Sequence, residues 1–280
     1  MEHMNILITG CSSGIGLQMA LSLAARGYTV LATVLNEDEK KQIIHPNIHP
    51  LILNLLNKQS IAACVEEAKR ITEGQIDLLI NNAGIAIAGA IEDVGYDALI
   101  HQFQVNDIGL CEITRLILPL MHQAGSGKIV NISSMLSICV FPYRGVYGAS
   151  KYALRAINDA LRLEMKAINS PIRIVLIEAG PMQTQIRENA IELSKNYLDF
   201  ASSKYQKDYE RLLVSGKNQQ SMPFIKPPEA IVALIEKIIR SKNPRAVYRF
   251  GFMPKFLNFL KYILPTHLFD RFILYILKIE

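Results

Sequence analysis

The sequence of 280 residues contains no tryptophan and only four cysteines, which stand far apart at Cys11, Cys64, Cys111 and Cys139. No two of them form a Cys-x-x-Cys pair, so there is no cysteine pair that could bind zinc together with histidines. This pattern argues against a disulfide framework and against a structural metal site. We therefore expect reduced thiols that pack as small apolar side chains, a cytoplasmic location and no metal ion.

Long apolar runs and blocks of one charge are also missing. No uninterrupted apolar stretch approaches the roughly 18–20 residues that a membrane-spanning helix requires. The first residues, Met1-Glu2-His3, lead almost directly into a strand-like stretch, so a signal peptide is not expected. The formal net charge is +5, and the lysines and arginines are spread along the chain, which argues against nucleic acid as a partner.

Apolar residues are abundant: they make up 50% of the sequence, against 20% for charged residues. A chain of this length and composition can build one large core, and we expect a single globular domain. Short apolar runs alternate with longer helical patterns, an order that predicts an α/β fold with a doubly wound parallel sheet covered by helices on both faces. The predicted strands are 5–9, 29–34, 49–54, 78–81, 128–133 and 173–177, and the predicted helices are 16–26, 58–72, 97–124 and 149–168.

The stretch "TGCSSGIG", residues 9–16, places three glycines where the first strand leads into the first helix. Glycines permit a tight turn and a close approach of another molecule to the backbone, and the unpaired N–H groups of a helix start favour an anion. Such a turn suits a pyrophosphate, although glycines also serve in plain turns. In a doubly wound sheet, ligands bind at the carboxyl ends of the strands, which is the edge where this turn lies.

Further motifs follow in order: "NNAG" at 81–84, "VND" at 105–107, "NISS" at 131–134, "YGASK" at 147–151 and "AGPMQT" at 179–184. With the glycine spacing Gly-x-x-x-Gly-x-Gly, they resemble the classical branch of the short-chain dehydrogenase/reductase family, in register over residues 4–185. The turn at Gly180-Pro181 resembles the members that act as hydroxysteroid or retinol dehydrogenases. The resemblance implies a Rossmann fold and an NAD(P)-dependent oxidoreductase that interconverts a hydroxyl and a carbonyl group.

Four residues carry the chemistry that this resemblance implies. Tyr147 and Lys151 share a helix face, and an ammonium nearby is expected to lower the pKa of the phenol, which makes Tyr147 a general acid/base. Ser134 would hydrogen-bond the substrate oxygen, with Ser133 as its rival. By resemblance, Lys151 also holds the nicotinamide ribose, and Asn106 maintains a water-linked proton path. The alternative for Asn106 is a helix-interior asparagine whose side chain is already satisfied.

The predicted cofactor site draws on several segments of the chain. The glycine-rich turn would hold the pyrophosphate, the residues after the second and third strands would border the adenosine, and Thr184 would contact the carboxamide. Residues 82–84 would border the adenosine ribose or, alternatively, only stabilise the sheet. The residues assigned to this site by resemblance are Gly10, Ser12, Ser13, Gly14, Ile15, Gly16, Thr33, Asn54, Leu55, Asn82, Ala83, Gly84, Tyr147, Lys151, Pro181 and Thr184.

The sequence departs from the family pattern after the second strand, in "LATVLNEDE" at 31–39. Thr33 stands where NAD-type members carry an aspartate, and Leu35 stands where NADP-type members carry an arginine. A carboxylate would repel a ribose 2′-phosphate, so its absence at Thr33 leads us to expect NADP, with NAD as the alternative. Asn54 replaces an aspartate near the adenine amino group, where its amide oxygen can still accept a hydrogen bond, and Leu55 would lend its backbone.

Beyond the motifs, residues 183–226 are polar and rich in tyrosine and lysine and predict a mobile helical flap over the substrate. Residues 246–280 are dense in Phe, Leu and Ile but broken by charges and by Pro265, which predicts two amphipathic helices in an extension of a catalytic domain 1–245. The extension could lie on a membrane surface, cover an apolar cleft or form a subunit contact. The candidate lining residues Met135, Phe141, Tyr143 and Met182 could equally be ordinary packing.

These features favour a lipophilic alcohol or ketone, such as a steroid, a retinoid or a fatty derivative, as the small-molecule substrate. The alternative function is a nucleotide-binding sensor or a membrane-surface interaction protein with little turnover. The complete set of general acid, lysine, serine and asparagine argues against that alternative, because a sensor has no need of a general acid. By analogy with the family, helices at about 108–124 and 150–168 would form a homodimer or homotetramer.

Overall fold

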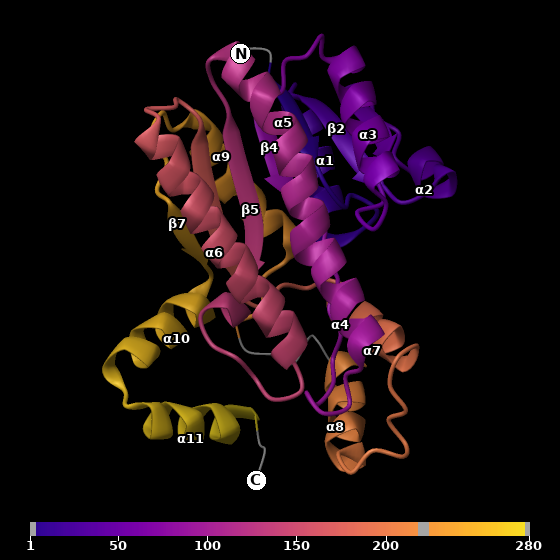
Figure 1. Ribbon diagram of the computed structural model, residues 1–280, viewed down its shortest axis with the longest axis vertical. Helices are drawn as coiled ribbons and strands as arrows, with labels where there is room; N and C mark the ends of the chain where they lie inside the picture. The colour runs from indigo at the N-terminus through magenta and orange to yellow at the C-terminus, as the bar shows by residue number, and fades with distance from the viewer. Residues whose placement is uncertain (1–3, 218–223, 278–280) are drawn as a thin grey trace.

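The computed structural model describes residues 4–217 and 224–277, and a parallel sheet runs through the middle of the molecule with helices on both faces (Figure 1). The sheet has seven strands in the order β3-β2-β1-β4-β5-β6-β7, and every strand pair is parallel. The predicted doubly wound sheet is therefore confirmed. The strands are β1 (Asn5–Ile8), β2 (Thr29–Val34), β3 (Ile48–Ile52), β4 (Leu78–Asn81), β5 (Lys128–Ser134), β6 (Arg173–Ala179) and β7 (Val247–Phe250).

The inner strands are buried along their whole length. All residues of β1 and β4 are buried, and their sequences, "NILI" and "LLIN", show no alternation of apolar and polar side chains. This is expected of a parallel sheet, because helices cover both of its faces. The strand order reverses between β1 and β4. In such sheets the crevice at the carboxyl ends of the strands on either side of the reversal binds ligands.

Two helical layers bury the sheet. On one face α1 and α9 pack Met19, Leu23 and Ile235 against the strands, and on the other α3 and α5 pack Ile61 and Ile113. The helices are α1 (Gly14–Ala24), α2 (Glu37–Gln42), α3 (Lys58–Ile71), α4 (Tyr96–Phe103), α5 (Leu110–Ala124), α6 (Gly145–Ala167), α7 (Ile186–Lys195), α8 (Gln206–Lys217), α9 (Val232–Arg240), α10 (Phe252–Ile263) and α11 (Thr266–Leu277), with a π-helical turn η1 (Gln104–Gly109) and the 3₁₀ turns η2 (Met135–Ser137) and η4 (Pro228–Ile231).

Two predicted helices differ from the observed ones in ways that matter for the site. The helix predicted over 97–124 is divided by the π-helical turn η1, which contains Asn106. Single π-helical turns inside α-helices are frequent at functional sites. The helix predicted to begin at 149 begins instead at Gly145, so that Tyr147 and Lys151 both lie on α6.

The C-terminal residues begin inside the sheet. Sequence analysis placed 246–280 in an extension, but β7 lies within that stretch and pairs with β6. Its half-buried residues, among them a charged one, give a weak strand signal. Arg249 on β7 and Arg155 on α6 both form ion pairs with the buried carboxylate of Glu178 on β6, at 3.0 and 2.5 Å. After β7, α10 and α11 lie on either side of Pro265, as predicted.

Four helices gather at the carboxyl end of the strands. In Figure 1, α10 and α11 lie below the sheet at the lower left, and α7 and α8 lie at the lower right. The helices α7 and α8 belong to the predicted flap 183–226, of which residues 218–223 lie outside the described residues. Within the described part of the chain, no helix is both long enough and apolar enough to span a bilayer.

Candidate active site

Two of the predicted catalytic residues, Asn106 on η1 and Lys151 on α6, come together beside the loop after β4. A Cβ atom added to Gly84, just after β4, would lie 3.2 Å from Oδ1 of Asn106 and 3.6 Å from Nζ of Lys151. The loop after β4, the turn η1 and the helix α6 therefore meet at this glycine. The Lys151 ammonium also lies 5.7 Å from the ring centroid of Tyr147 and donates to the carbonyl of Ile132 on β5 at 3.4 Å.

Ser134, the last residue of β5, completes the group. Its side chain acts on the phenol of Tyr147 and lowers the pKa of that phenol, and its Oγ accepts a hydrogen bond from the N–H of Leu136 at 3.2 Å. Successive side chains on a strand point to opposite faces, so Ser133 cannot take this place. The hydroxyl of Ser133 is buried and has no hydrogen-bond partner among the described residues. The structure therefore places Ser134, and not Ser133, on the side of Tyr147, and its contact with the substrate oxygen stays a prediction.

One side of the Tyr147 ring is apolar. The ring packs against a cluster that joins η2 and the following loop to the two last helices, and that we call the C-terminal apolar cluster. Lys261 on α10 ties the same loop down, because its ammonium donates to the carbonyl of Ile138 and to the hydroxyl of Tyr152, the latter at 2.8 Å. The buried members of the cluster are Met135, Leu136, Cys139, Phe141, Leu257, Phe269 and Ile273.

Burial raises the pKa of Tyr147 to about 12, and the side chain of Ser134 and the charge of Arg144 offset this only in part. The predicted lowering of this pKa by Lys151 is wrong for this structure, because loss of water around the phenol outweighs the charges nearby. Tyr147 is consequently protonated at neutral pH, the form that can give a proton to a carbonyl oxygen. Burial also lowers the pKa of Lys151 to about 8, against an opposing effect of Asp107.

The side chain of Asn106 is fully engaged. Its Oδ1 accepts a hydrogen bond from the N–H of Ile85 at 2.8 Å, and its Nδ2 donates to the carbonyl of Ile85 at 2.9 Å and to Oγ of Ser150 at 3.0 Å. This is the satisfied asparagine that sequence analysis gave as the alternative. The side chain fixes the loop after β4 against α6, and the predicted part in a proton path stays a prediction.

The glycine-rich turn between β1 and α1 depends on its glycines for its backbone conformation and its close packing. Gly10 and Gly14 adopt positive φ angles of 72° and 57°, which favour glycine. A Cβ on Gly16 would lie 2.0 Å from the carbonyl oxygen of Gly10, and one on Gly10 would lie 2.8 Å from Cα of Ala83. Thr184 faces Gly14, since a Cβ there would approach the side chain of Thr184 to 3.5 Å. The absence of side chains at Gly10 and Gly16 thus lets the turn pack against itself and against Ala83. The unpaired N–H groups at the start of α1 suit a pyrophosphate.

The segment after β4 holds this turn in place. The side-chain amide of Asn82 donates to the carbonyls of Thr9 and Gly10 at 2.9 and 3.0 Å, and the N–H groups of Asn82 and Ala83 both donate to Oγ1 of Thr9 at 3.0 Å. Of the two roles considered for residues 82–84, the structure thus supplies the stabilising one. Ser13 precedes α1 in an extended conformation, and its side chain makes no capping hydrogen bond.

Two residues reach the glycine-rich turn from the end of β2 and the start of α2: Thr33, which was predicted, and Glu39, which sequence analysis missed. Thr33 is buried and its Oγ1 accepts a hydrogen bond from the N–H of Gly10 at 3.1 Å, so it supports the turn. The carboxylate of Glu39, in the first turn of α2, accepts from Oγ of Ser12 at 2.5 Å and from the N–H of Leu35 at 2.9 Å. An acidic residue about 20 positions after such a glycine turn commonly binds the ribose, and this spacing was the available signal.

The remaining predicted residues are placed by local hydrogen bonds. Oδ1 of Asn54 accepts from the N–H of Leu56 at 2.9 Å, which leaves one lone pair for an adenine amino group. The carbonyl of Leu55 lies against η1, 2.4 Å from where a Cβ on Gly109 would be. The carbonyl of Pro181 accepts from the N–H of Lys226 at 3.1 Å, which closes the segment that carries Thr184.

The candidate lining residues divide into three environments. Met135 and Phe141 belong to the C-terminal apolar cluster beside Tyr147. Met182 is buried in the core between the sheet and α1. The hydroxyl of Tyr143 donates to a carboxylate oxygen of Asp208 on α8 at 2.7 Å, so this side chain ties the predicted flap to the start of α6.

Two arginines on the flap side of Tyr147 were also missed. The guanidinium of Arg144, which directly precedes α6, acts on the phenol of Tyr147 and is itself repelled by Arg187 on α7. Burial lowers the pKa of Arg144 to about 10, and the charge of Arg187 lowers it further. The start of α6 is therefore a place of positive charge.

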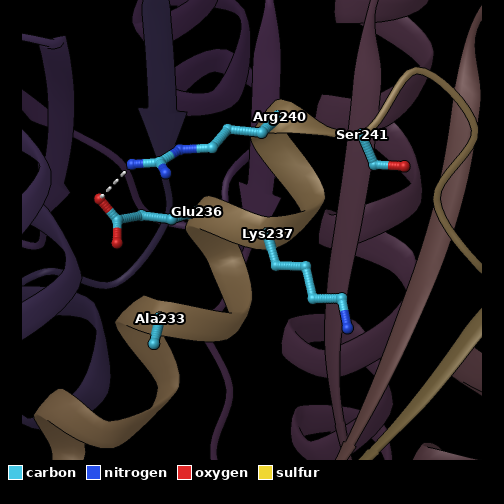
Figure 2. Close-up of a pocket in the computed structure, with 5 residues that line it drawn as sticks. All are labelled: Ala233, Glu236, Lys237, Arg240 and Ser241. Carbon is cyan, nitrogen blue, oxygen red and sulfur yellow. Dashed lines mark ion pairs between the residues drawn. The ribbon is translucent and has the colours of Figure 1, made fainter.

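A surface hollow of about 420 Å³ lies elsewhere, along α9. Figure 2 shows that its side chains are mostly polar and that Arg240 turns back to Glu236, with which it forms an ion pair at 3.8 Å. None of the predicted site residues lines it, and we assign it no role. Its lining residues are Ala233, Glu236, Lys237, Arg240 and Ser241.

Comparison with proteins of known sequence finds many relatives. Residues 4–194 match the family model of the short chain dehydrogenases. The chain is 31% identical to the uncharacterized oxidoreductase YbbO of Escherichia coli K12, over 95% of this chain and 93% of the relative. It is 33% identical to 3-ketodihydrosphingosine reductase of Bacteroides thetaiotaomicron, over 87% and 86%, and 30% identical to human 17-beta-hydroxysteroid dehydrogenase type 1, over 87% and 76%.

Solved structures share the fold. A short chain dehydrogenase from Burkholderia cenocepacia J2315 in complex with NADP superposes with a TM-score of 0.74 at 21% identity, covering 96% of this chain and 97% of the other. One from Burkholderia phymatum in complex with NAD gives 0.76 at 20% identity, covering 88% of each. Together with the family model and the relatives, the geometry described above leads to one conclusion: the chain belongs to the short-chain dehydrogenase/reductase family of oxidoreductases.

Proposed function

We propose that this protein is an NAD(P)-dependent oxidoreductase that interconverts a hydroxyl and a carbonyl group on a lipophilic small molecule, such as a steroid, a retinoid or a fatty derivative. The observation that carries the proposal is the position of Tyr147, with the ammonium of Lys151 5.7 Å from the centroid of its ring and an apolar cluster packed beside it. The relatives that act on 3-ketodihydrosphingosine and on 17-beta-hydroxysteroids support the substrate class.

The residues of the site divide the reaction between them. The glycine-rich turn between Gly10 and Gly16 would hold the pyrophosphate, and Lys151 would hold the nicotinamide ribose. The bound cofactor supplies the hydride in carbonyl reduction. Ser134 then holds the substrate oxygen, and the protonated phenol of Tyr147 donates the proton that this oxygen needs. In alcohol oxidation the phenolate of Tyr147 takes that proton instead.

For the cofactor, we propose NADP with NAD also accepted. The absence of a carboxylate at Thr33 supports NADP, and solved members of the fold contain one or the other. The carboxylate of Glu39 works against a 2′-phosphate, because it already lies on Ser12. The Glu39 side chain would have to turn away from Ser12 before the 2′-phosphate of NADP could bind beside the glycine-rich turn.

A screen of steroid, retinoid and aliphatic carbonyl compounds with NADH and NADPH in parallel tests the proposal. We expect lipophilic carbonyl compounds to oxidise the cofactor, measured as a loss of absorbance at the nicotinamide band. Short polar carbonyl compounds, added to the screen for comparison, should oxidise little of it. Absence of turnover across all three classes, or a preference for small polar substrates, would contradict it.

We also propose a peripheral membrane contact through the C-terminal helices. The faces of α10 and α11 that point away from the core expose Phe259, Tyr262 and Tyr275, at 58%, 90% and 81%. Flotation with phosphatidylcholine vesicles should carry the full chain upward and should fail for a Phe259→Ser/Tyr262→Ser variant. Tyr96→Ser, which removes an equally exposed ring on α4, is the control. Equal flotation of all three would exclude this contact.

For the oligomeric state, we propose a homodimer or homotetramer formed through α5 and α6. Two apolar side chains near this surface, Ile108 on η1 and Leu163 on α6, are 61% and 55% exposed. Exposed apolar side chains of this kind are common in subunit contacts. Light scattering after size exclusion should give a mass of two or four chains, and Leu163→Lys should lower it. A monomer at micromolar concentration would contradict the proposal.

A further inference from the structure

A lysine near the end of α10 makes contacts that the reaction described so far does not use. Lys261 is exposed overall, yet its ammonium reaches two other segments of the chain. It donates to the carbonyl of Ile138 at 2.5 Å and to the hydroxyl of Tyr152 at 2.8 Å, and it lies 5.2 Å from the centroid of the Tyr152 ring. An ammonium has three protons to donate and is attracted to an aromatic face, so these contacts together hold it in one place.

The two partners of Lys261 are also joined to each other. The hydroxyl of Tyr152 donates to the same carbonyl of Ile138 at 2.5 Å. Ile138 is only 3% exposed, and a buried carbonyl oxygen with two lone pairs needs donors, which the phenol and the ammonium supply together. Lys261, Tyr152 and Ile138 thus form a closed set of hydrogen bonds, which we call the Lys261 clamp.

The Lys261 clamp joins three segments, and two of them adjoin catalytic residues. Tyr152 directly follows Lys151 on α6. Ile138 directly follows η2, and η2 begins directly after Ser134. The third segment is α10, which also packs on η2. One ammonium from the C-terminal helices is therefore bonded both to the segment after Ser134 and to the helix that carries Lys151.

The segment 135–141 lies directly on α6 beside Tyr147. A Cβ atom added to Gly148 would lie 3.3 Å from the side chain of Val140 and 3.7 Å from the carbonyl oxygen of Leu136. The same segment supplies buried members of the C-terminal apolar cluster, whose other buried members come from α10 and α11. A shift of this segment would therefore change the apolar side of the site.

We propose that Lys261 is a positioning residue. Through the Lys261 clamp, α10 holds segment 135–141 against α6 and so fixes the apolar side of the substrate site beside Tyr147. This role rests on the proposed function, because that site is the one assigned to the lipophilic substrate. Loss of the clamp should weaken substrate binding more than the chemical step, since Lys151 keeps its own hydrogen bond to the carbonyl of Ile132 on β5.

The first experiment follows the clamp without turnover, through the thiol of Cys139. This thiol is 2% exposed and lies in the C-terminal apolar cluster with Leu257 of α10 and Phe269 of α11, so it reacts with a maleimide when that cover opens. In the full chain, Lys261→Met removes the ammonium and keeps an apolar side chain. Labelling of Cys139 by N-ethylmaleimide, measured by peptide mass spectrometry, should become about tenfold faster.

The electrostatics of Cys139 make the direction of this change informative. Burial raises the pKa of the thiol to about 11, and the charge of Lys261 opposes that rise. Loss of the charge alone would therefore leave less of the reactive thiolate and slow the labelling. A faster rate in Lys261→Met consequently reports opening of the cover.

Lys255→Met is the matched control, because Lys255 is an exposed lysine on the same helix with no partner among the described residues. Cys64, buried between α3 and the sheet, reports general unfolding in every variant. Tyr152→Phe should also speed the labelling of Cys139, and combining it with Lys261→Met should add little, because both changes act on one set of bonds. An unchanged Cys139 rate in Lys261→Met, or an equal rise in Lys255→Met or at Cys64, would overturn the proposal.

The second experiment measures the steady-state kinetics of carbonyl reduction by the full chain at saturating NADPH. Lys261→Met should raise the KM of a lipophilic ketone by about tenfold and change kcat by less than about twofold, while Lys255→Met should change neither. A KM at the wild-type value, or a fall in kcat alone, would refute the positioning role. If the wild type reduces no carbonyl compound, the proposed function fails, while the Cys139 labelling still decides whether Lys261 holds the segment.

Discussion

The two ends of the cofactor crevice differ in how tightly the scaffold holds them. At the catalytic end, Asn106 and Lys151 are buried and lie side by side next to Gly84, and each is hydrogen-bonded to the backbone of a neighbouring segment. At the adenosine end, Leu35 is 60% exposed, and the Glu39 carboxylate reaches Ser12 from the first turn of a short surface helix. The catalytic side chains thus lie where packing fixes their positions. The side chains expected to decide between NAD and NADP lie at the surface, where they can be substituted without disturbing the core.

The largest effect should come from Tyr147, where the catalytic end is most sensitive. Tyr147→Phe removes the proton donor and keeps the ring in the C-terminal apolar cluster, so turnover should fall by about two to four orders of magnitude. Cofactor affinity, measured by fluorescence titration with NADPH, should change little. Tyr96→Phe, at an exposed tyrosine on α4, should leave both unchanged. Turnover of Tyr147→Phe near the wild-type rate would remove Tyr147 from the reaction.

The next effect concerns the turn that joins the two ends. In Gly16→Ala the new Cβ would meet the carbonyl oxygen of Gly10 at 2.0 Å, so the turn must open. We expect the Tm to fall by several degrees, measured by thermal denaturation, and NADPH binding to be lost, measured by fluorescence titration. Gly95→Ala is the control, because nothing lies within 4 Å of a Cβ there. A Gly16→Ala variant that binds NADPH as tightly as the wild type would mean that the turn does not need a glycine at this position to bind the cofactor.

A smaller effect is expected at the adenosine end. Glu39→Gln removes a negative charge beside Ser12 and should strengthen binding of NADPH relative to NADH by about fivefold, since the repulsion between charges near water is about 1 kcal/mol. Isothermal titration of both cofactors measures the ratio. Glu37→Gln is the control, because Glu37 is exposed and faces Lys40 at 3.8 Å. If the ratio changes equally in both variants, Glu39 has no special place in cofactor choice.

The smallest effect tests the charge at the flap side of the catalytic end. The guanidinium of Arg144 lowers the pKa of Tyr147, so Arg144→Gln should raise it. Alcohol oxidation needs the phenolate, so its rate increases with pH. In Arg144→Gln this increase should occur at a pH higher by about half a unit. Arg240→Gln, on the hollow along α9, should not move the profile. A downward shift would mean that Arg144 acts on Tyr147 through something other than its charge.

The same difference between the two ends explains what the sequence could predict. The strands and the catalytic group were predictable because buried parallel strands are continuous apolar runs and because Ser134, Tyr147 and Lys151 stand at fixed spacings. Glu39 was missed because it reaches Ser12 only from its position on the surface helix α2. Arg144 was missed because the helix was predicted to begin at 149, whereas α6 begins at Gly145, directly after Arg144. The direction of the Tyr147 pKa also depends on burial, which spacing does not report. The strand β7 escaped notice because it is short and only half-buried.

The ion pairs of Glu178 determine where the chain can be shortened at its C-terminal end without disturbing the sheet. Arg249 provides one of the two cations that face this carboxylate, and it enters the sheet only with β7. A chain cut at residue 245 would leave the anion with Arg155 alone and would expose the hydrogen-bonding edge of β6. A cut beyond Phe250 therefore keeps all seven strands but removes the buried Leu257 and Phe269 from the cluster beside Tyr147. A cut before Val247 also removes a strand from the sheet.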